Sequence, residues 1–204
     1  MITIIDYGLG NIKAFSNMYK RLNVAARIAQ SAAELEGATK IILPGVGHFD
    51  RAMKLLDESG MRESLDDLVL NKEVPVVGIC VGMQMLAESS AEGQRAGLGW
   101  VKGRVESLRL LPVPNDKPLP HMGWNDVTPK DGEQLFAGLE SDARFYFLHS
   151  FYFSCADPAD MAASANYGAE FACAVRSGHV HGVQFHPEKS HHWGARLLKN
   201  FADL

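Results

Sequence analysis

The chain has 204 residues, of which 47% are hydrophobic and 22% charged, with a formal net charge of -4. These proportions are those of an ordinary globular protein, so they argue against a membrane or disordered class, and the negative balance argues against nucleic acid as a partner. At roughly 100 to 200 residues per domain, this length predicts a single domain over residues 1–204.

The first residues and the cysteines indicate the cellular setting. Residues 1–6 lack the basic start and the long apolar run of a secretion signal. Cys80, Cys155 and Cys173 include no CxxC pair, and such a set is typical of neither a disulfide framework nor a zinc site. We therefore expect a cytoplasmic protein that carries no metal and no other cofactor.

Short apolar runs alternate with amphipathic stretches through the first half of the chain. This alternation predicts βα units on a mostly parallel sheet, which is an α/β fold. The expected strands are 1–6, 24–29, 40–43 and 74–79, and the expected helices are 12–22, 50–58, 61–71 and 83–89.

The second half of the chain is richer in strand patterns. A proline-rich stretch, 112–120, predicts an exposed loop rather than a domain boundary. The apolar spacing of the last residues predicts a closing amphipathic helix over 193–201. The expected strands are 103–110, 124–127, 144–148, 171–175 and 179–185.

A thiol between two glycines stands at the end of the strand expected at 74–79. Gly78 and Gly82 flank Cys80 in the layout of a nucleophile elbow, in which a sharp turn pushes the side chain outward. A bulkier flank would clash where the turn doubles back. The helix expected after Cys80 points free amides at the sulfur and favours the thiolate. The alternative is a buried structural cysteine at a tight turn.

A histidine and a carboxylate follow at the end of a later strand. His186 ends an alternating strand, Pro187 stops that strand, and Glu188 comes next. This spacing lets Glu188 accept a hydrogen bond from one imidazole nitrogen, which leaves the other nitrogen to take the proton of Cys80. The sequence thus predicts a catalytic triad of Cys80, His186 and Glu188, in preference to a structural histidine.

Attack of a thiolate on an amide also needs fixed N–H donors for the oxyanion that forms. The turn 44–47 follows the strand at 40–43, at the carboxyl edge where open α/β sheets bind their ligands. We expect this turn to supply one donor and the amide of Val81, directly after the nucleophile, to supply the other. Taken alone, 44–47 is better explained as a tight turn.

These motifs resemble those of the class I glutamine amidotransferases, through the elbow at 78–84 and the triad segment 186–188. The likeness runs essentially end to end, and it is greatest to the glutaminase subunits of imidazole glycerol phosphate synthases, in 5–11, 43–47, 120–125 and 182–190. The resemblance implies a three-layer, flavodoxin-like α/β fold whose mostly parallel central sheet carries an added antiparallel portion.

The resemblance also implies a reaction and a set of site residues. Cys80 would attack L-glutamine, ammonia would leave, and water would hydrolyse the glutamyl thioester to glutamate. Val46 and Val81 match the positions of the oxyanion hole. The residues that match the glutamine site are Gly47, Gln84, His149, Ser150 and Phe151. The residues that match a partner interface are His121, Met122, Trp124, Asn125, Tyr146 and Lys189.

The implied partner is a (βα)8 barrel cyclase, bound as a heterodimer, which uses the ammonia to form imidazole glycerol phosphate and AICAR in histidine biosynthesis. A paralogous branch that supplies ammonia for surface-sugar (lipopolysaccharide) amidation shares these motifs, and 189–194 resembles that branch. The histidine pathway is the preferred acceptor. A cysteine peptidase-like thiol hydrolase could use the same triad and is the alternative from another enzyme class.

Overall fold

The computed structural model describes residues 1–112, 114 and 117–204. Its central nine-stranded sheet has the order β2-β1-β3-β4-β12-β11-β10-β7-β8. From β2 to β12 the neighbouring strands run parallel, and the remaining pairs are antiparallel. The strands are β1 (Ile2–Ile5), β2 (Ala26–Ala29), β3 (Lys40–Gly45), β4 (Val76–Cys80), β7 (His121–Pro129), β8 (Arg144–His149), β10 (Met161–Asn166), β11 (Glu170–Ser177) and β12 (Val180–Val183).

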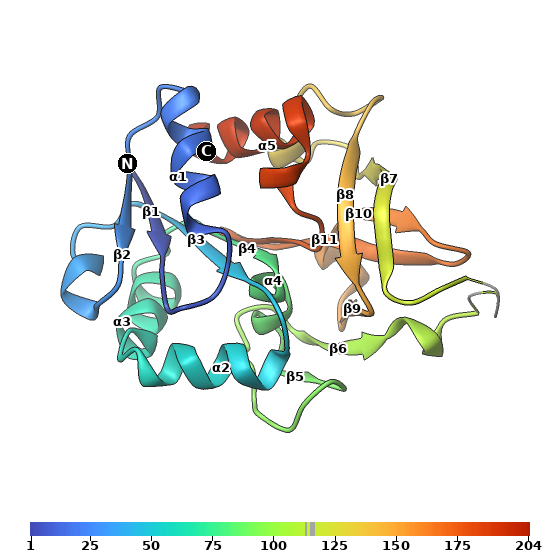
Figure 1. The fold of residues 1–204 in the computed structure, drawn as a ribbon, viewed down its shortest axis with the longest axis horizontal. Coiled ribbons are helices and arrows are strands. Elements are labelled where there is room, and N and C mark those ends of the chain that lie inside the picture. The colour runs from blue at the N-terminus through green and yellow to red at the C-terminus, as the bar shows by residue number, and fades with distance from the viewer. Residues whose placement is uncertain (113, 115–116) are drawn as a thin grey trace.

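Helices cover both faces of this sheet, which makes a three-layer arrangement (Figure 1). Helices α1 and α5 lie on one face, and α2, α3 and α4 lie on the other (Figure 1). A second, three-stranded sheet has the order β5-β6-β9, with β5 (Ser89–Ser90), β6 (Gly103–Ser107) and β9 (Phe151–Cys155). The helices are α1 (Ile12–Arg21), α2 (Phe49–Glu58), α3 (Arg62–Asp66), α4 (Val81–Met85) and α5 (His191–Asp203).

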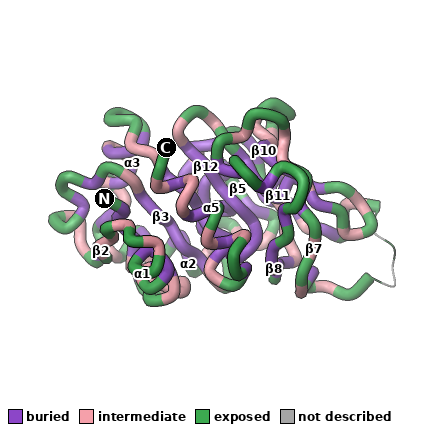
Figure 2. Tube along the Cα trace, turned by 90° about the horizontal axis from the view of Figure 1, so that it is seen from above, coloured by how far each residue is buried: buried purple, intermediate pink, exposed green. Residues whose placement is uncertain are grey.

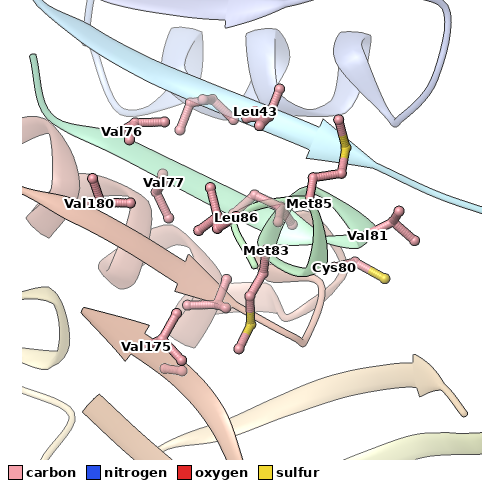
Figure 3. Close-up of a cluster of buried hydrophobic side chains, with 14 of the residues drawn as sticks. Leu43, Val76, Val77, Cys80, Val81, Met83, Met85, Leu86, Val175 and Val180 are labelled. Atoms are coloured by element: carbon pink, nitrogen blue, oxygen red, sulfur yellow. The ribbon is translucent and has the colours of Figure 1, made fainter. Parts of the chain in front are cut away.

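The inner parallel strands are covered on both faces, so their sequences are mostly apolar instead of alternating. Every residue of β1 and β4 is buried, and Figure 2 shows buried residues concentrated in the centre of the molecule with exposed ones on its outer surface. Met83 and Met85 on α4, and Leu86 directly after it, belong to the apolar cluster around β4 and β12 (Figure 3). This packing holds the end of β4 and the start of α4 in a rigid environment.

The register of two parallel strands positions the expected site. Gly45, the last residue of β3, pairs with Cys80, the last residue of β4. Because parallel strands end at the same edge of a sheet, the loops that follow β3 and β4 emerge side by side. The strand β12 pairs with the other side of β4 and brings residues 184–188 to the same edge.

The expected α/β class, with a parallel core and antiparallel strands, is confirmed. The helix expected at 83–89 instead begins at Val81 and ends at Met85, since the chain then turns into β5. The expected strand 103–110 ends at Ser107, where a 3-10 turn (Leu108–Leu110) begins. Strands β9 and β10 were not expected. Part of the proline-rich loop 112–120 lies outside the described residues.

Within the described ranges, no helix combines the length and the apolar character that crossing a bilayer requires.

Candidate active site

Cys80 occupies a strained turn between β4 and α4. Its backbone has φ 56° and ψ -113°, a region that residues with a side chain rarely adopt. The neighbouring Gly78 is required sterically, because a Cβ there would lie 2.5 Å from the carbonyl oxygen of Gly82. Figure 3 shows the Cys80 sulfur directed away from the apolar cluster. This is the geometry of a nucleophile elbow.

His186 and Glu188 follow β12 and form a buried pair. The imidazole Nδ1 lies 2.9 Å from Glu188 Oε1, and the two side chains are 4% and 2% exposed. The His186 backbone N–H donates to the carbonyl oxygen of Tyr146 on β8 at 2.9 Å, which fixes the histidine against the neighbouring strand. With Nδ1 engaged by the carboxylate, Nε2 is the ring nitrogen left for the thiol.

The electrostatics of this pair favour a charged imidazole. Burial alone would lower the pKa of His186, but hydrogen bonds to the Cys80 and Glu188 side chains, together with their charges, raise it to about 10. Burial raises the pKa of Glu188, whereas the hydrogen bond from His186 and its positive charge lower it, and the net pKa lies below the ordinary value. The arrangement therefore suits the imidazolium that would form if His186 took up the thiol proton.

A third side chain orients the carboxylate. Asn11, in the loop after β1, donates from Nδ2 to Glu188 Oε1 at 2.8 Å, the same oxygen that meets the imidazole. The other carboxylate oxygen, Oε2, is buried without a hydrogen-bond partner among the described residues. Asn11 was not singled out from the sequence, although it ends the 5–11 segment that carries part of the resemblance.

A cavity of about 390 Å³ opens at the sulfur. The residues from the sequence prediction that line it are Cys80, His186, Val46, Val81, Gly47, Gln84, His149, Ser150, Phe151 and Lys189. The expected nucleophile, the expected oxyanion donors and the expected glutamine site thus share one cavity. Because Val81 is the first residue of α4, its N–H has no intrahelical acceptor and is free to serve a ligand.

Besides Asn11, two further polar residues in or next to the cavity wall were missed by the sequence analysis. Glu92 places a carboxylate in the cavity wall, where its Oε2 accepts from the Phe49 N–H at the start of α2 at 2.8 Å. Gln184 lies behind the sulfur and donates from Nε2 to Cys80 Sγ at 3.8 Å. Glu92 follows β5 in a loop with no motif that distinguishes it, whereas Gln184 lies two residues before His186.

Most of the residues expected at a partner interface form one exposed aromatic surface beside the cavity. Met122 and Trp124, on β7, are 64% and 39% exposed. Trp124 meets Tyr146 edge-on, with 6.2 Å between the ring centroids, and the Lys189 ammonium lies 5.7 Å from the centroid of the Tyr146 ring. We call Met122, Trp124, Tyr146, Leu148 and Lys189 the aromatic face.

His121 and Asn125 do not belong to the aromatic face. His121 is only 2% exposed, and its ring stacks on Tyr167 and Phe147 at centroid distances of 4.1 and 4.8 Å. Successive side chains of a strand point to opposite sides, so His121 and the half-buried Asn125 lie on the side of β7 opposite to Trp124. The expectation that the His121 side chain faces a partner is therefore corrected.

Comparisons with known proteins agree with this geometry. The model of the class I glutamine amidotransferase family matches residues 3–204, and the chain belongs to this family. The expected enzyme class is confirmed, and the family match argues against a peptidase.

The chain is also similar over its full length to three curated proteins, each of which it covers completely. It is 63% identical to the imidazole glycerol phosphate synthase subunit HisH of Bdellovibrio bacteriovorus. It is 50% identical to the subunit of the same name from Leptospira borgpetersenii, and 46% identical to subunit HisH 2 of Pseudomonas aeruginosa. These relatives confirm the resemblance to the glutaminase subunit of that synthase.

Two solved structures share the fold. One, described as a glutamine amidotransferase, has a TM-score of 0.75 at 22% identity and covers 100% of this chain and 99% of its own. The other, PurLQS from Thermotoga maritima, has a TM-score of 0.73 at 16% identity and covers 99% of this chain and 97% of its own. They confirm the expected class I amidotransferase fold.

Proposed function

We propose that the chain is the glutaminase subunit of an imidazole glycerol phosphate synthase and hydrolyses L-glutamine to supply ammonia for histidine biosynthesis. The observation that carries this proposal is the strained Cys80 elbow, which shares one cavity with His186, whose imidazole is hydrogen-bonded to Glu188. The names of the full-length relatives favour this acceptor over surface-sugar amidation. The proposed unit is a single domain over residues 1–204, because the strands of both sheets contribute to one apolar core.

The proposed reaction begins with proton transfer from Cys80 Sγ to His186 Nε2. The thiolate then attacks the side-chain amide carbon of glutamine, and the oxyanion is stabilised by the backbone N–H groups of Val46 and Val81, each contributing roughly 2.7 to 4 kcal/mol. His186 returns the proton to the leaving nitrogen, so that ammonia departs and a glutamyl thioester remains. Water, deprotonated by His186, cleaves the thioester, releasing glutamate and restoring the thiol. Glu188 holds the imidazole throughout.

The cavity offers complementary groups for the rest of the amino-acid substrate. We assign Gly47, Gln84, His149, Ser150 and Phe151 to the glutamine site, since all five line the cavity around Cys80. The Glu92 carboxylate, also in the wall, suits the α-ammonium group of glutamine, because opposite charges attract strongly at a partly desolvated site.

The proposed partner is a (βα)8 barrel cyclase, bound as a heterodimer over the aromatic face. Exposed aromatic and methionine side chains of this kind are enriched in protein interfaces. Leu148 is 38% exposed on that face and also lines the cavity, and Lys189 lines it as well. Ammonia released at Cys80 would therefore leave the cavity directly under the partner, without passing through bulk water. We propose that Asn125 contacts the partner only at the edge of the interface, because its side chain is half-buried.

The test is Cys80→Ala in the complex that co-purifies with the chain. We expect glutamine-dependent synthesis to be lost, and synthesis from added ammonium salt to be retained, because the partner's chemistry needs no thiol. Cys155→Ala is the matched control, since Cys155 is a half-buried thiol that does not line the cavity. Unchanged glutamine-dependent synthesis in Cys80→Ala would refute the proposed role of the thiol. Identification of the co-purifying protein as a sugar-modifying enzyme would refute the proposed acceptor.

A further inference from the structure

Two buried histidines link β7 to the wall of the cavity. His121 on β7 and His149 on β8 occupy opposite positions in the antiparallel pairing. Their ring nitrogens, His121 Nδ1 and His149 Nε2, lie 2.9 Å apart. The other nitrogen of each ring also has a partner. His149 Nδ1 lies 2.7 Å from the Phe151 carbonyl oxygen, and His121 Nε2 lies 3.3 Å from Asn125 Nδ2. The result is an unbroken row of hydrogen bonds.

The ends of this row determine the position of every proton. A carbonyl oxygen only accepts, so His149 Nδ1 donates to Phe151, and the neutral ring therefore accepts at Nε2. His121 must then donate from Nδ1 and accept at Nε2 from the Asn125 amide, whose own oxygen accepts from the Asp126 N–H at 2.9 Å. Each of the two histidines is thus satisfied as a neutral ring with its proton on Nδ1.

Burial keeps both rings neutral. It lowers the pKa of His121 to about 4, with a smaller effect from the charge of Lys117. It lowers the pKa of His149 to about 3, although the hydrogen bond to Phe151 opposes the shift. At neutral pH neither ring takes up a second proton, so the two side chains are suited to hold geometry rather than to act as acids.

The row continues from Phe151 to the nucleophile. The Phe151 carbonyl also lies 3.4 Å from Gln84 Nε2, which donates to Gln184 Oε1 at 3.0 Å. Gln184 in turn donates from its amide to Cys80 Sγ at 3.8 Å. Gln84 and Gln184 are 3% and 0% exposed, so water does not compete for these contacts.

We propose that His121 and His149 are positioning residues of the glutaminase site, which fix the Phe151 carbonyl and, through Gln84 and Gln184, the surroundings of the Cys80 sulfur. Because His121 lies on the strand whose opposite side carries Trp124, the row also connects the aromatic face to the nucleophile. This inference rests on the proposed function. It goes beyond that function by assigning a role to His121, which does not line the cavity.

The test compares His121→Phe with His121→Asn in the complex with the co-purifying partner. Phenylalanine keeps the ring that stacks on Tyr167 and Phe147 but cannot donate to His149. Asparagine sacrifices the stacking, yet its amide nitrogen occupies nearly the place of Nδ1 and can donate. We expect His121→Phe to raise the KM for glutamine and to lower kcat/KM about tenfold. In this variant His149 Nε2 would be a buried acceptor without a hydrogen-bond donor, and the His149 ring would no longer be held in position. His121→Asn should retain activity within about threefold.

This comparison separates positioning from simple packing. By packing alone, asparagine would be the more damaging substitution, so thermal stability and glutaminase activity should rank the two variants in opposite orders. His181→Phe is the control, because His181 is a histidine with 6% exposure on β12 that lies outside the row. It should leave the KM for glutamine unchanged.

Nitrogen NMR of the imidazoles gives an independent readout. Both rings should show the neutral form protonated on Nδ1, without titration between about pH 5 and 9. A titrating ring, wild-type kinetics in His121→Phe, or equal losses in the two His121 variants would overturn the inference. Cys80→Ala run in parallel distinguishes the two failures, because the proposed function fails only if the thiol proves dispensable.

Discussion

Gly82 lies so close to Leu43 that a Cβ at residue 82 would stand 1.9 Å from the Leu43 carbonyl oxygen. Leu43 belongs to β3 and Gly82 to the first turn of α4. The missing side chain therefore lets the helix after Cys80 pack directly on the strand that leads to the 44–47 turn. The expected oxyanion donors, the N–H groups of Val46 and Val81, lie on either side of this contact. The contact therefore sets the distance between them.

Gly82→Ala should consequently damage both stability and catalysis. The added methyl group must displace backbone, which we expect to lower the free energy of unfolding by about 3 kcal/mol, as overpacking does. Gly60→Ala is the control, because Gly60 has φ +71° and a Cβ there would meet nothing within 4 Å, so the substitution costs only about 1 kcal/mol of backbone strain. Urea unfolding and glutaminase assays measure both effects. Equal losses of stability and activity in Gly82→Ala and Gly60→Ala would contradict the steric argument.

Asn11 should act on catalysis through Glu188. Asn11→Ala removes a hydrogen bond to a buried carboxylate, a contact worth about 1.5 to 3 kcal/mol, so kcat should fall by roughly tenfold or more. Asn11→Asp should be worse, since a second negative charge would face Glu188 and weaken its hold on His186. The matched control is Asn71→Ala, which removes an exposed hydrogen bond to Asp67 and should leave kcat unchanged. A kcat for Asn11→Asp above that of Asn11→Ala would contradict the electrostatic argument.

Glu92→Gln tests the assignment of the α-ammonium site. Glutamine keeps an oxygen that can accept from the Phe49 N–H, so the start of α2 should remain capped while the charge is removed. We expect the KM for glutamine to rise about tenfold with little change in the unfolding free energy. Glu88→Gln is the control because Glu88 pairs with Lys102 on the surface. If both substitutions left KM unchanged, the charge of Glu92 would have no part in substrate binding.

Acid should destabilise the fold through its buried neutral histidines. Burial lowers the pKa of His121 and His181 to about 4, whereas an unperturbed histidine titrates near 6.5. As the pH falls from 6.5 to about 4, the unfolded chain binds protons that the folded chain does not, so stability is lost in this window. His121→Phe removes one such group. It should flatten the dependence of the unfolding free energy on pH by at most about 1.4 kcal/mol per pH unit, and an unchanged slope would contradict burial of a neutral ring.

The proposed triad residues could be singled out in the sequence because their signals are local. The glycines around Cys80 mark a sharp turn, and the proline after His186 marks the end of a strand. Both features involve only a few neighbouring residues. Contacts between distant segments carry no such signal, and Asn11 meets Glu188 across 177 positions of sequence. Sequence patterns therefore singled out the groups that are proposed to react but missed Asn11, whose side chain orients Glu188.

The interface prediction failed at His121 for a geometric reason. The resemblance assigned His121 to the partner together with Met122, Trp124 and Asn125, but alternate residues of a strand point to opposite sides. Met122 and Trp124 are exposed, and His121 is buried. Strand β10 was missed for another reason, since its sequence MAASAN lacks the β-branched and aromatic residues typical of strands. Pairing with β11 and β7 determines its conformation instead.

Trp124 is the residue of the aromatic face whose loss should weaken the complex most. It is 39% exposed, and its ring is held in place by stacking on His191 with 5.3 Å between the centroids and 6° between the planes. A rigid exposed tryptophan buries a large area on binding at little cost in conformational entropy, which is typical of hot-spot residues.

We therefore expect Trp124→Ala to raise the Kd for the proposed cyclase partner by about 30-fold, equivalent to about 2 kcal/mol. Isothermal titration calorimetry with the purified partner measures this change. Ile28→Ala is the matched control, because Ile28 is 38% exposed on β2, at the opposite edge of the sheet. An equal Kd for the two variants would place the partner elsewhere. A selective loss of affinity in Trp124→Ala would mean that the partner docks where Leu148 and Lys189 border the cavity, so that ammonia is released beneath it.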